Sequence, residues 1–219
     1  ENIQKGIFHI PKILHELDNL NVPFKMTIVG KGKHEEILRK QLKKFIGSGH
    51  VIFRGAIDPK EIPLFLKSID IFIFPSHFEG VGNALLEAMV AGCVCFSWLI
   101  EGLTDFVIDN KKTGFIHNLK DYKNFAKNIK ILNDDRELLK EISVRASQTS
   151  IERFSPKKSA AEYAKVLIDV MNQKIFDFEV KEWSKFKIDE NFVQSDEKYF
   201  PRELKKLIKE YLLKLGLLN

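Results

Sequence analysis

The stretch from residue 70 to residue 92 constrains the fold of this chain more than any other. It opens with the short apolar run Asp-Ile-Phe-Ile-Phe, of the kind that a parallel sheet buries. A Pro-Ser pair ends the run, two glycines follow, and residues 84–91 predict a helix that begins at Asn83 and closes at Gly92. A buried strand, a glycine turn and a helix in this order predict an α/β fold.

The turn between this strand and this helix predicts an anion site. Gly80 and Gly82 let the backbone come close to a ligand, and the helix points its unpaired N–H groups and positive dipole end at the same space. Glu79 and Glu87 flank the turn, with seven residues between them. Because carboxylates would repel a phosphate there, we expect them to face sugar hydroxyls, which donate hydrogen bonds to them. The alternative is an ordinary strand–helix turn without a ligand.

The whole stretch resembles the E-x7-E motif of retaining GT-B fold glycosyltransferases of the group 1, or family-4, type. Similar sequences read Pro-Ser-x-x-Glu-Gly and, a few residues later, Glu-Ala-Met-Ala-x-Gly. Here the two parts are residues 75–80 and 87–92. The resemblance covers roughly residues 5 to 172. It implies a Rossmann-like, doubly wound parallel sheet that forms the C-terminal, donor-binding half of a GT-B enzyme.

The resemblance also implies roles for individual residues. Glu79 lies by the donor sugar and is the catalytic candidate, Glu87 binds ribose hydroxyls, and Lys5, in the Lys-Gly pair that opens the first helix, reaches the donor diphosphate. The other implied donor-binding residues are Gly30, Gly32, Gly55, Ala56, Ile57, Gly80, Val81, Gly82, Asn83 and Ala84. Among these, the backbone that follows Gly55 meets the base of the nucleotide.

Two parts of the chain depart from the family pattern. The loop Glu-Gly-Leu-Thr-Asp at residues 101–105 stands where the family has Gly-Gly-x-Pro-Glu, so its detailed shape need not follow the family. The family also has a strand and an Arg before the Lys-Gly pair, which here would precede residue 1. That strand is central in the resembled fold, between the strands at residues 24–29 and 70–74. We therefore expect a fragment of a longer protein, the alternative being a sheet that closes differently.

Alternating strand and helix signals predict a parallel sheet with helices on both faces. The predicted strands span residues 24–29, 51–54, 70–74 and 93–97, with a last strand that ends near residue 116. The predicted helices begin with one that starts near Ile7 and then span residues 34–45, 58–67, 84–91, 121–132, 135–150 and 156–172.

We expect two regions in the chain. Residues 1–173 are predicted to form the nucleotide-sugar-binding domain, without its first strand, and residues 174–219 a C-terminal extension. In the extension, Pro201 begins a helix with apolar residues on one side and lysines on the other. We favour a helix docked on its own protein; the alternative is a basic amphipathic helix on an anionic membrane.

Composition narrows the remaining possibilities. A net charge of +5 suits a phosphate-bearing ligand and does not require nucleic acid, so no nucleic-acid partner is expected. Cys93 and Cys95 are expected to be reduced core residues, and no apolar run is long enough for a membrane span. No Asp-x-Asp and no metal-ligand spacing of histidines is present, so neither a metal nor a cofactor is expected beside the nucleotide-sugar substrate. We expect a cytoplasmic protein, with the inner membrane surface as a second location.

These patterns predict a hexosyltransferase-type enzyme. It would move a sugar from a nucleotide donor to a hydroxyl of an acceptor glycan or lipid-linked glycan, with retention of configuration, in polysaccharide or glycolipid biosynthesis. The N-terminal, acceptor-binding domain is missing from this chain. Two alternatives stay open: a GT-B-like sugar-nucleotide epimerase, and a non-enzymatic basic module that binds membrane or nucleic acid, whose binding would depend steeply on salt.

Overall fold

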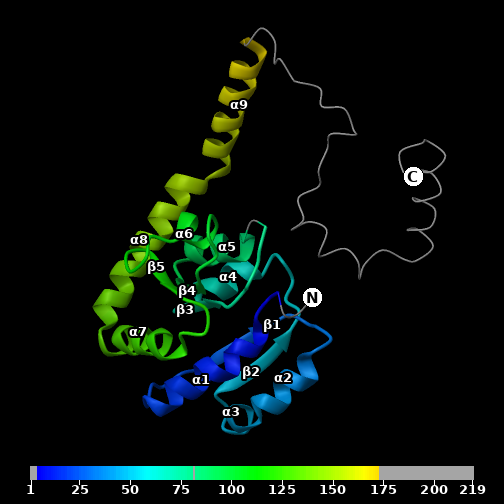
Figure 1. Ribbon diagram of the computed structural model, residues 1–219, viewed down its shortest axis with the longest axis vertical. Coiled ribbons are helices and arrows are strands. Elements are labelled where there is room, and N and C mark those ends of the chain that lie inside the picture. The colour runs from blue at the N-terminus through cyan, green and yellow to red at the C-terminus, as the bar shows by residue number, and fades with distance from the viewer. Residues whose placement is uncertain (1–3, 81, 173–219) are drawn as a thin grey trace, which may run out of the picture. The chain divides into compact units, whose positions relative to one another are not determined.

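The computed structural model describes residues 4–80 and 82–172 (Figure 1). The predicted C-terminal extension and its amphipathic helix lie outside these residues, as does Val81. The first of two compact units ends at Lys165, inside the last described helix, and the site described below belongs to that unit.

Five strands and ten helical segments make up the described part of the chain. The strands are β1 (Met26–Val29), β2 (Val51–Gly55), β3 (Ile71–Phe74), β4 (Val94–Trp98) and β5 (Gly114–His117). The helices are the 3-10 helix η1 (Ile7–His9), α1 (Ile10–Asn19), α2 (Glu35–Gln41), α3 (Lys43–Gly47), α4 (Ile62–Lys67), α5 (Asn83–Ala91), α6 (Thr104–Val107), α7 (Tyr122–Asp134), α8 (Arg136–Phe154) and α9 (Pro156–Asn172). All the predicted strands are therefore present, and the α/β class is confirmed.

The strands pair in parallel but form two sheets instead of one. β1 pairs with β2, while β3, β4 and β5 form a separate sheet in that order. The predicted Rossmann-like class with parallel strands is confirmed, and among the described residues the strands are divided between these two sheets. The physical reason is that β1 and β3 are the strands between which the resembled fold places its first strand, and no described strand occupies that position.

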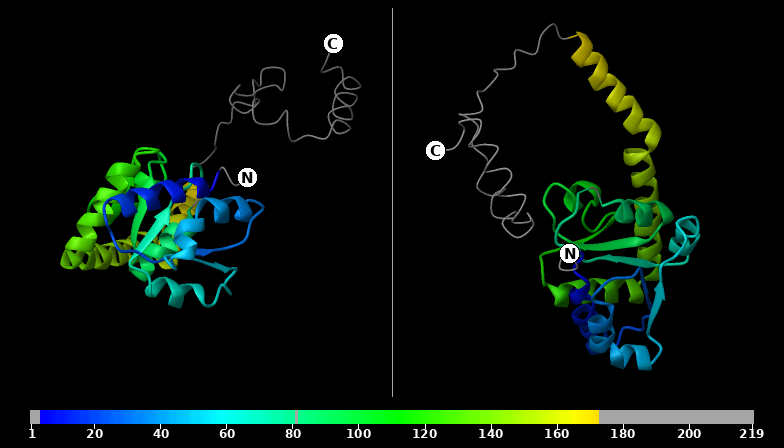
Figure 2. Two further views of the ribbon diagram at one scale, coloured as in Figure 1. Left: turned by 90° about the horizontal axis from the view of Figure 1, so that it is seen from below. Right: turned by 90° about the vertical axis from the view of Figure 1, so that its right-hand side faces the viewer.

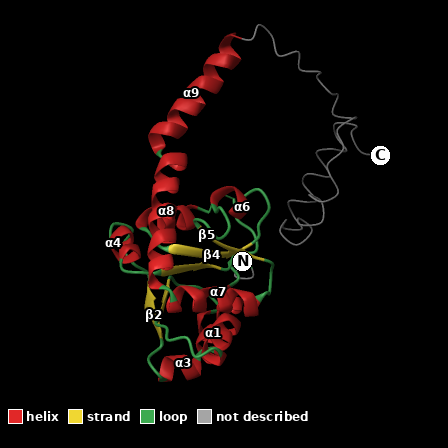
Figure 3. Ribbon diagram, turned by 90° about the vertical axis from the view of Figure 1, so that its left-hand side faces the viewer, coloured by secondary structure: helices red, strands yellow, loops and turns green. Residues whose placement is uncertain are grey.

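One hydrophobic core covers one face of both sheets. It contains Phe96 and Trp98 of β4 together with Val51 of β2, all buried. Helices α1 and α7 pack against each other on this side, as the labels in Figures 1 and 3 show. Ile13 and Phe125 contribute fully buried side chains from these two helices.

A second core covers the opposite face of the three-stranded sheet only. Its buried side chains come mainly from α4, β3, α5, the α6 region and Cys95 of β4. Figure 2 shows helices on both sides of the strands in this part of the chain. Cys93 and Cys95 are free thiols in this core, as predicted. Burial raises the pKa of Cys93 to about 11 and holds the pKa of Cys95 well above that of an ordinary thiol.

Two predicted helices differ from their predicted spans, and one short helix was not predicted. The predicted helix at residues 34–45 is two helices, α2 and α3, separated at Leu42, whose side chain is fully buried in the core. The helix predicted from Asp58 begins only at Ile62, because Asp58 instead accepts a hydrogen bond from the Lys60 N–H in the preceding turn. The single turn α6 was not predicted from the sequence.

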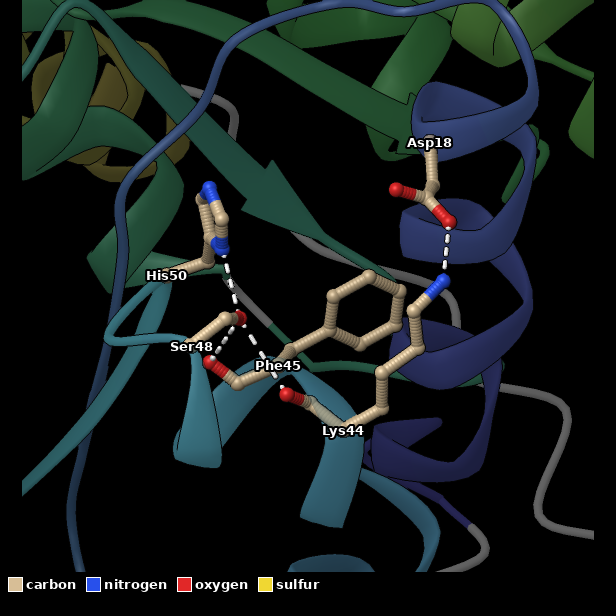
Figure 4. Close-up of polar contacts among 5 residues, drawn as sticks. All are labelled: Asp18, Lys44, Phe45, Ser48 and His50. Atoms are coloured by element: carbon tan, nitrogen blue, oxygen red, sulfur yellow. Dashed lines mark hydrogen bonds and ion pairs between the residues drawn. The ribbon is translucent and has the colours of Figure 1, made fainter.

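A polar cluster holds α3 against α1 at the far end of the two-stranded sheet (Figure 4). The Lys44 Nζ of α3 lies 2.5 Å from the Asp18 Oδ2 of α1. The Ser48 hydroxyl donates to the carbonyls of Lys44 and Phe45 and lies 2.6 Å from His50 Nδ1. The hydrogen bond from Lys44 lowers the pKa of Asp18. These contacts fix the loop that leads into β2.

Candidate functional site

The predicted anion turn folds as a strand, a loop and a helix. β3 ends at the buried Phe74, and α5 begins at Asn83 after Gly82, which has a left-handed φ of 67°. Gly92 closes α5 with a φ of 93°, as predicted. Gly82 stands at the N-cap and has no side chain to cap the helix, and Asn83 is the first helical residue.

The two glycines of the turn, Gly80 and Gly82, differ in why the structure favours glycine there. Gly82 needs its positive φ, and a Cβ there would lie 3.3 Å from Leu103 Cδ2. A Cβ on Gly80 would meet no described atom within 4 Å. The fold therefore requires glycine at position 82, while position 80 faces open space, as a backbone that approaches a ligand would.

The residues before α1 pack directly on the loop after β3. Gly6 has a φ of 63°, and a Cβ there would lie 1.8 Å from the Pro75 carbonyl oxygen. The His77 N–H donates to the Gln4 carbonyl at 2.8 Å, and the Gln4 amide donates to the Phe78 carbonyl at 3.2 Å. Segments about 70 residues apart in sequence thus form one surface.

Two predicted site residues meet in this surface. The Lys5 Nζ lies 2.5 Å from Glu79 Oε1, which also accepts a hydrogen bond from the buried Ser76 hydroxyl at 3.0 Å. The Lys5 side chain is 59% exposed and that of Glu79 11% exposed. An ammonium has three donor hydrogens, so Lys5 can hold Glu79 and still donate to an incoming anion.

Glu87 occupies an exposed position on α5, four residues after Asn83. Residues at this spacing share one side of a helix, so Glu87 lies on the side of the first helical residue, about one turn further along. No described hydrogen bond or ion pair engages its carboxylate, which leaves it available to a ligand.

The other predicted loops meet at the ends of β1 and β2. The Gly30 N–H donates to the Gly55 carbonyl at 2.7 Å, and both glycines have positive φ. Gly32 and Ala56 are exposed beside them, and Ile57 is half-buried. Among the described residues, no hydrogen bond or ion pair joins this group to Lys5 and Glu79.

A histidine contact behind the Lys5–Glu79 pair was missed by sequence reasoning. His9 Nε2 of η1 contacts His77 Nε2, and His9 Nδ1 lies 2.7 Å from the Tyr122 hydroxyl of α7. The three residues are 68 and 113 positions apart in sequence, and no local pattern marks them.

The loop at residues 101–105 departs from the family pattern in sequence but is well packed. Thr104, which stands in place of the family's Pro, is fully buried. Its hydroxyl accepts a hydrogen bond from the Ile100 N–H at 2.8 Å and donates to the Trp98 carbonyl at 3.0 Å. Thr104 therefore fixes the turn into α6 by hydrogen bonds.

Two surface hollows are lined by residues other than the predicted donor-binding ones. One, of about 560 Å³, is lined by asparagines and acids near the ends of β4 and β5, among them Asp105 and Asn118. The other, of about 470 Å³, lies between α1 and the start of α7, and its lining includes His9 and Tyr122. Neither is lined by a predicted donor-binding residue.

The described residues also bear on metal binding and on membrane insertion. No group of three or more His, Cys, Asp or Glu side chains within residues 4–80 and 82–172 is arranged to hold a metal ion. No helix in the same part of the chain is long and apolar enough to cross a membrane. Metal-free binding stays a prediction.

Comparison with known protein families identifies the family to which the chain belongs. The profile of the family described as "Glycosyl transferases group 1" matches residues 2–149, which is more than half of the sequence. The chain belongs to the group 1 glycosyl transferases. The match includes every residue predicted above to bind the donor.

Two curated relatives are identical to this chain at about a quarter of the aligned residues. The sulfoquinovosyl transferase SQD2 of Arabidopsis thaliana is 25% identical over 69% of this chain and 28% of its own length. The N-acetyl-alpha-D-glucosaminyl L-malate synthase of Bacillus anthracis is 26% identical over 78% of this chain and 43% of its own length. The chain therefore spans less than half of these relatives.

Solved structures confirm the fold. HepE of Anabaena, crystallised with UDP, superposes with a TM-score of 0.66 at 19% identity, over 76% of this chain and 46% of that chain. The C-terminal domain of the group 1 glycosyl transferase LpcC of Francisella tularensis gives a TM-score of 0.60 at 23% identity, over 70% of this chain and 81% of that domain. The fold is the Rossmann-like half of a GT-B glycosyltransferase.

Proposed function

We propose that this chain is the donor-binding half of a retaining, family-4 type GT-B glycosyltransferase. The observation that carries this proposal is the meeting of Lys5 and Glu79 beside the start of α5. Within the group 1 family, a lysine, a glycine turn and a helix N-terminus together suit a diphosphate. HepE of Anabaena was crystallised with UDP and with UDP-glucose, which makes uridine nucleotides the first probes.

The chemistry would depend on charge that builds on the leaving diphosphate. The first N–H groups of α5 and the Lys5 ammonium stabilise this charge as the bond to the sugar breaks. Glu79, held in place by Ser76 and Lys5, lies by the donor sugar. Glu87, further along α5, accepts hydrogen bonds from the ribose hydroxyls. The loops at Gly30 and Gly55 contact the base.

The proposal includes the rest of the protein. An acceptor-binding domain and one further strand precede residue 1, and that strand fills the position between β1 and β3 and joins the two sheets. Residues 1–173 form the donor domain and residues 174–219 an extension, whose helix docks on its own protein, with peripheral membrane contact as the alternative. The protein works in the cytoplasm on an acceptor glycan or lipid-linked glycan, in polysaccharide or glycolipid biosynthesis.

The test is calorimetric titration of the 219-residue chain with UDP, ADP, GDP and UDP-glucose. We expect saturable binding of a nucleoside diphosphate and of its sugar, and no transfer to an acceptor by this chain alone. Absence of binding by every nucleotide would overturn the donor-site assignment. Measurable acceptor glycosylation would overturn the proposal that the acceptor domain is missing.

A further inference from the structure

The contact between His9 and His77 joins the same two segments as the Lys5–Glu79 pair. His9 belongs to η1 and is 7% exposed, while His77 lies two residues before Glu79 in the loop after β3. The two rings face each other through Nε2 atoms, with ring centroids 4.7 Å apart. The Trp98 ring packs edge-on against the His9 ring, with ring centroids 5.4 Å apart. His9 is therefore buried while His77 is exposed, and the contact between them ties the exposed loop histidine to the buried one.

A hydrogen bond between two imidazole nitrogens needs one proton between them. With both rings neutral, the Tyr122 hydroxyl can donate to His9 Nδ1, and His9 Nε2–H can donate to His77 Nε2. If the pair takes up one more proton, the donor order reverses: His77 Nε2–H donates to His9 Nε2, and His9 Nδ1–H donates to the Tyr122 oxygen. A second extra proton would set two N–H groups head to head. The geometry thus accepts one added proton and resists two.

The surrounding charges decide which ring carries that proton. Burial, together with the nearby His77, Lys12 and Lys120, lowers the pKa of His9 to about 4. Tyr122 stays neutral, because burial raises its pKa. His77 instead shares its loop with Glu79 and packs on Gly6, next to Lys5. An added charge is therefore better solvated on His77, which is exposed, than on the buried His9.

We propose that His77 and His9 are positioning residues for Glu79, and that the pair takes up a proton when a nucleoside diphosphate binds. This inference rests on the proposed function. The incoming negative charge favours a cationic imidazole, because opposite charges at short range stabilise each other. The cation then strengthens diphosphate binding, while the bond to His9 holds the loop that carries Glu79 against η1.

The test measures protons bound with the nucleotide. The full 219-residue chain is titrated with UDP, and in parallel with ADP and GDP, in two buffers of different ionisation enthalpy at pH 7. The difference in apparent enthalpy gives the number of protons taken up. Because the phosphates of the ligand also titrate, the decisive quantity is the difference between the wild type and His77→Gln.

Three variants separate positioning from protonation. Gln can replace the hydrogen bond of an Nε2 atom but cannot titrate, so His77→Gln is expected to bind within about threefold of the wild type at pH 8, about 0.7 kcal/mol, and to lose the extra proton. His77→Phe loses both the hydrogen bond and the proton, and is expected to bind about tenfold more weakly. His50→Gln is the matched control, because His50 contacts Ser48 at the other end of the two-stranded sheet.

Each outcome of these titrations supports or overturns a separate claim. A fraction of a proton taken up by the wild type and by His50→Gln, but not by His77→Gln, supports the inference. Equal proton uptake in the wild type and His77→Gln would overturn it while the proposed function stands, because nucleotide binding itself would be present. Equal affinity of His77→Phe and the wild type at pH 7 would overturn the positioning role. If no nucleotide binds to the wild type, both the inference and the proposed function are wrong.

Discussion

The two sheets of this molecule are buried to very different extents. All five residues of β4, at the centre of the three-stranded sheet, are buried. In β2 only Val51 is buried, and Ile52 is 54% exposed. The reason is that the three-stranded sheet has a hydrophobic core on each face, whereas β1 and β2 contribute to one core only.

This difference indicates what each sheet does. The three-stranded sheet is a rigid base from which the loop after β3 and helix α5 present Glu79 and Glu87. The two-stranded sheet presents glycine loops at Gly30 and Gly55, joined by a backbone hydrogen bond. The proposed diphosphate and ribose contacts thus belong to the well-buried sheet, and the base contacts to the exposed one.

The largest effect is expected from Phe96→Ala in β4. Phe96 is fully buried and stacks on Phe115 with ring centroids 4.6 Å apart. Removing its ring leaves a cavity that the packed sheet cannot close, so the free energy of unfolding should fall by about 3–5 kcal/mol. Urea denaturation checks this value. A loss below about 1 kcal/mol would mean that the three-stranded sheet is not the rigid base.

The next largest effect is a loss of stability in acid that is caused by His9, whose ring packs on Trp98 of β4. The native pKa of His9 is about 4, against 6.5 ordinarily, so below pH 6.5 the unfolded chain binds a proton that the native one refuses. Stability should therefore fall between pH 6.5 and pH 4, by up to about 3 kcal/mol from this group. Burial lowers the pKa of His117 as well, which adds loss of the same sign.

Unfolding measured across this pH window tests the assignment. His9→Gln should reduce the slope of stability against pH, and the control His50→Gln, at the two-stranded sheet, should keep it. If both variants gave the wild-type slope, His9 would not be the buried neutral group that the structure shows.

A smaller effect is expected from Glu87→Ala, and it concerns binding. Because a charged group's hydrogen bonds to the ribose are lost, nucleotide affinity should fall by about 1–3 kcal/mol. The matched control is Glu137→Ala, an exposed glutamate near the start of α8. Calorimetry of both folded variants gives the comparison, and an unchanged affinity of Glu87→Ala would rule out the ribose role.

The smallest effect is expected from Ile52→Ala in β2. Ile52 is more than half exposed and faces no described core, so the free energy of unfolding should change by less than about 0.5 kcal/mol. Urea denaturation alongside Phe96→Ala tests the contrast directly. A loss close to that of Phe96→Ala would show that the second face of the two-stranded sheet is covered in solution.

Sequence reasoning succeeded where the signal was local. The strand, turn and helix around Gly82 were predicted from adjacent residues, and Gly92 closes α5 as expected. Asp121 and Asp135, at the predicted starts of α7 and α8, accept capping hydrogen bonds from N–H groups three residues later. Each of these features depends on neighbours within one helical turn.

It failed where distant segments decide the structure. The break between α2 and α3 depends on burial of Leu42 in a tertiary core, and the His9–His77 contact depends on how η1 meets the loop after β3. The pairing of Lys5 with Glu79 was likewise not predicted, although both residues were assigned to the site. Side-chain contacts over such separations leave no periodic pattern in one sequence.

The central claim is that this chain binds a nucleoside diphosphate with its own groups and without a metal ion. The measurement is one titration of UDP repeated with a chelator, with added manganese, and with Lys5→Ala. The account predicts equal affinity with chelator and with manganese, because Lys5 and the start of α5 neutralise the phosphates. It also predicts that Lys5→Ala weakens UDP binding more than uridine binding. A requirement for manganese, or equal losses for UDP and uridine, would contradict the account.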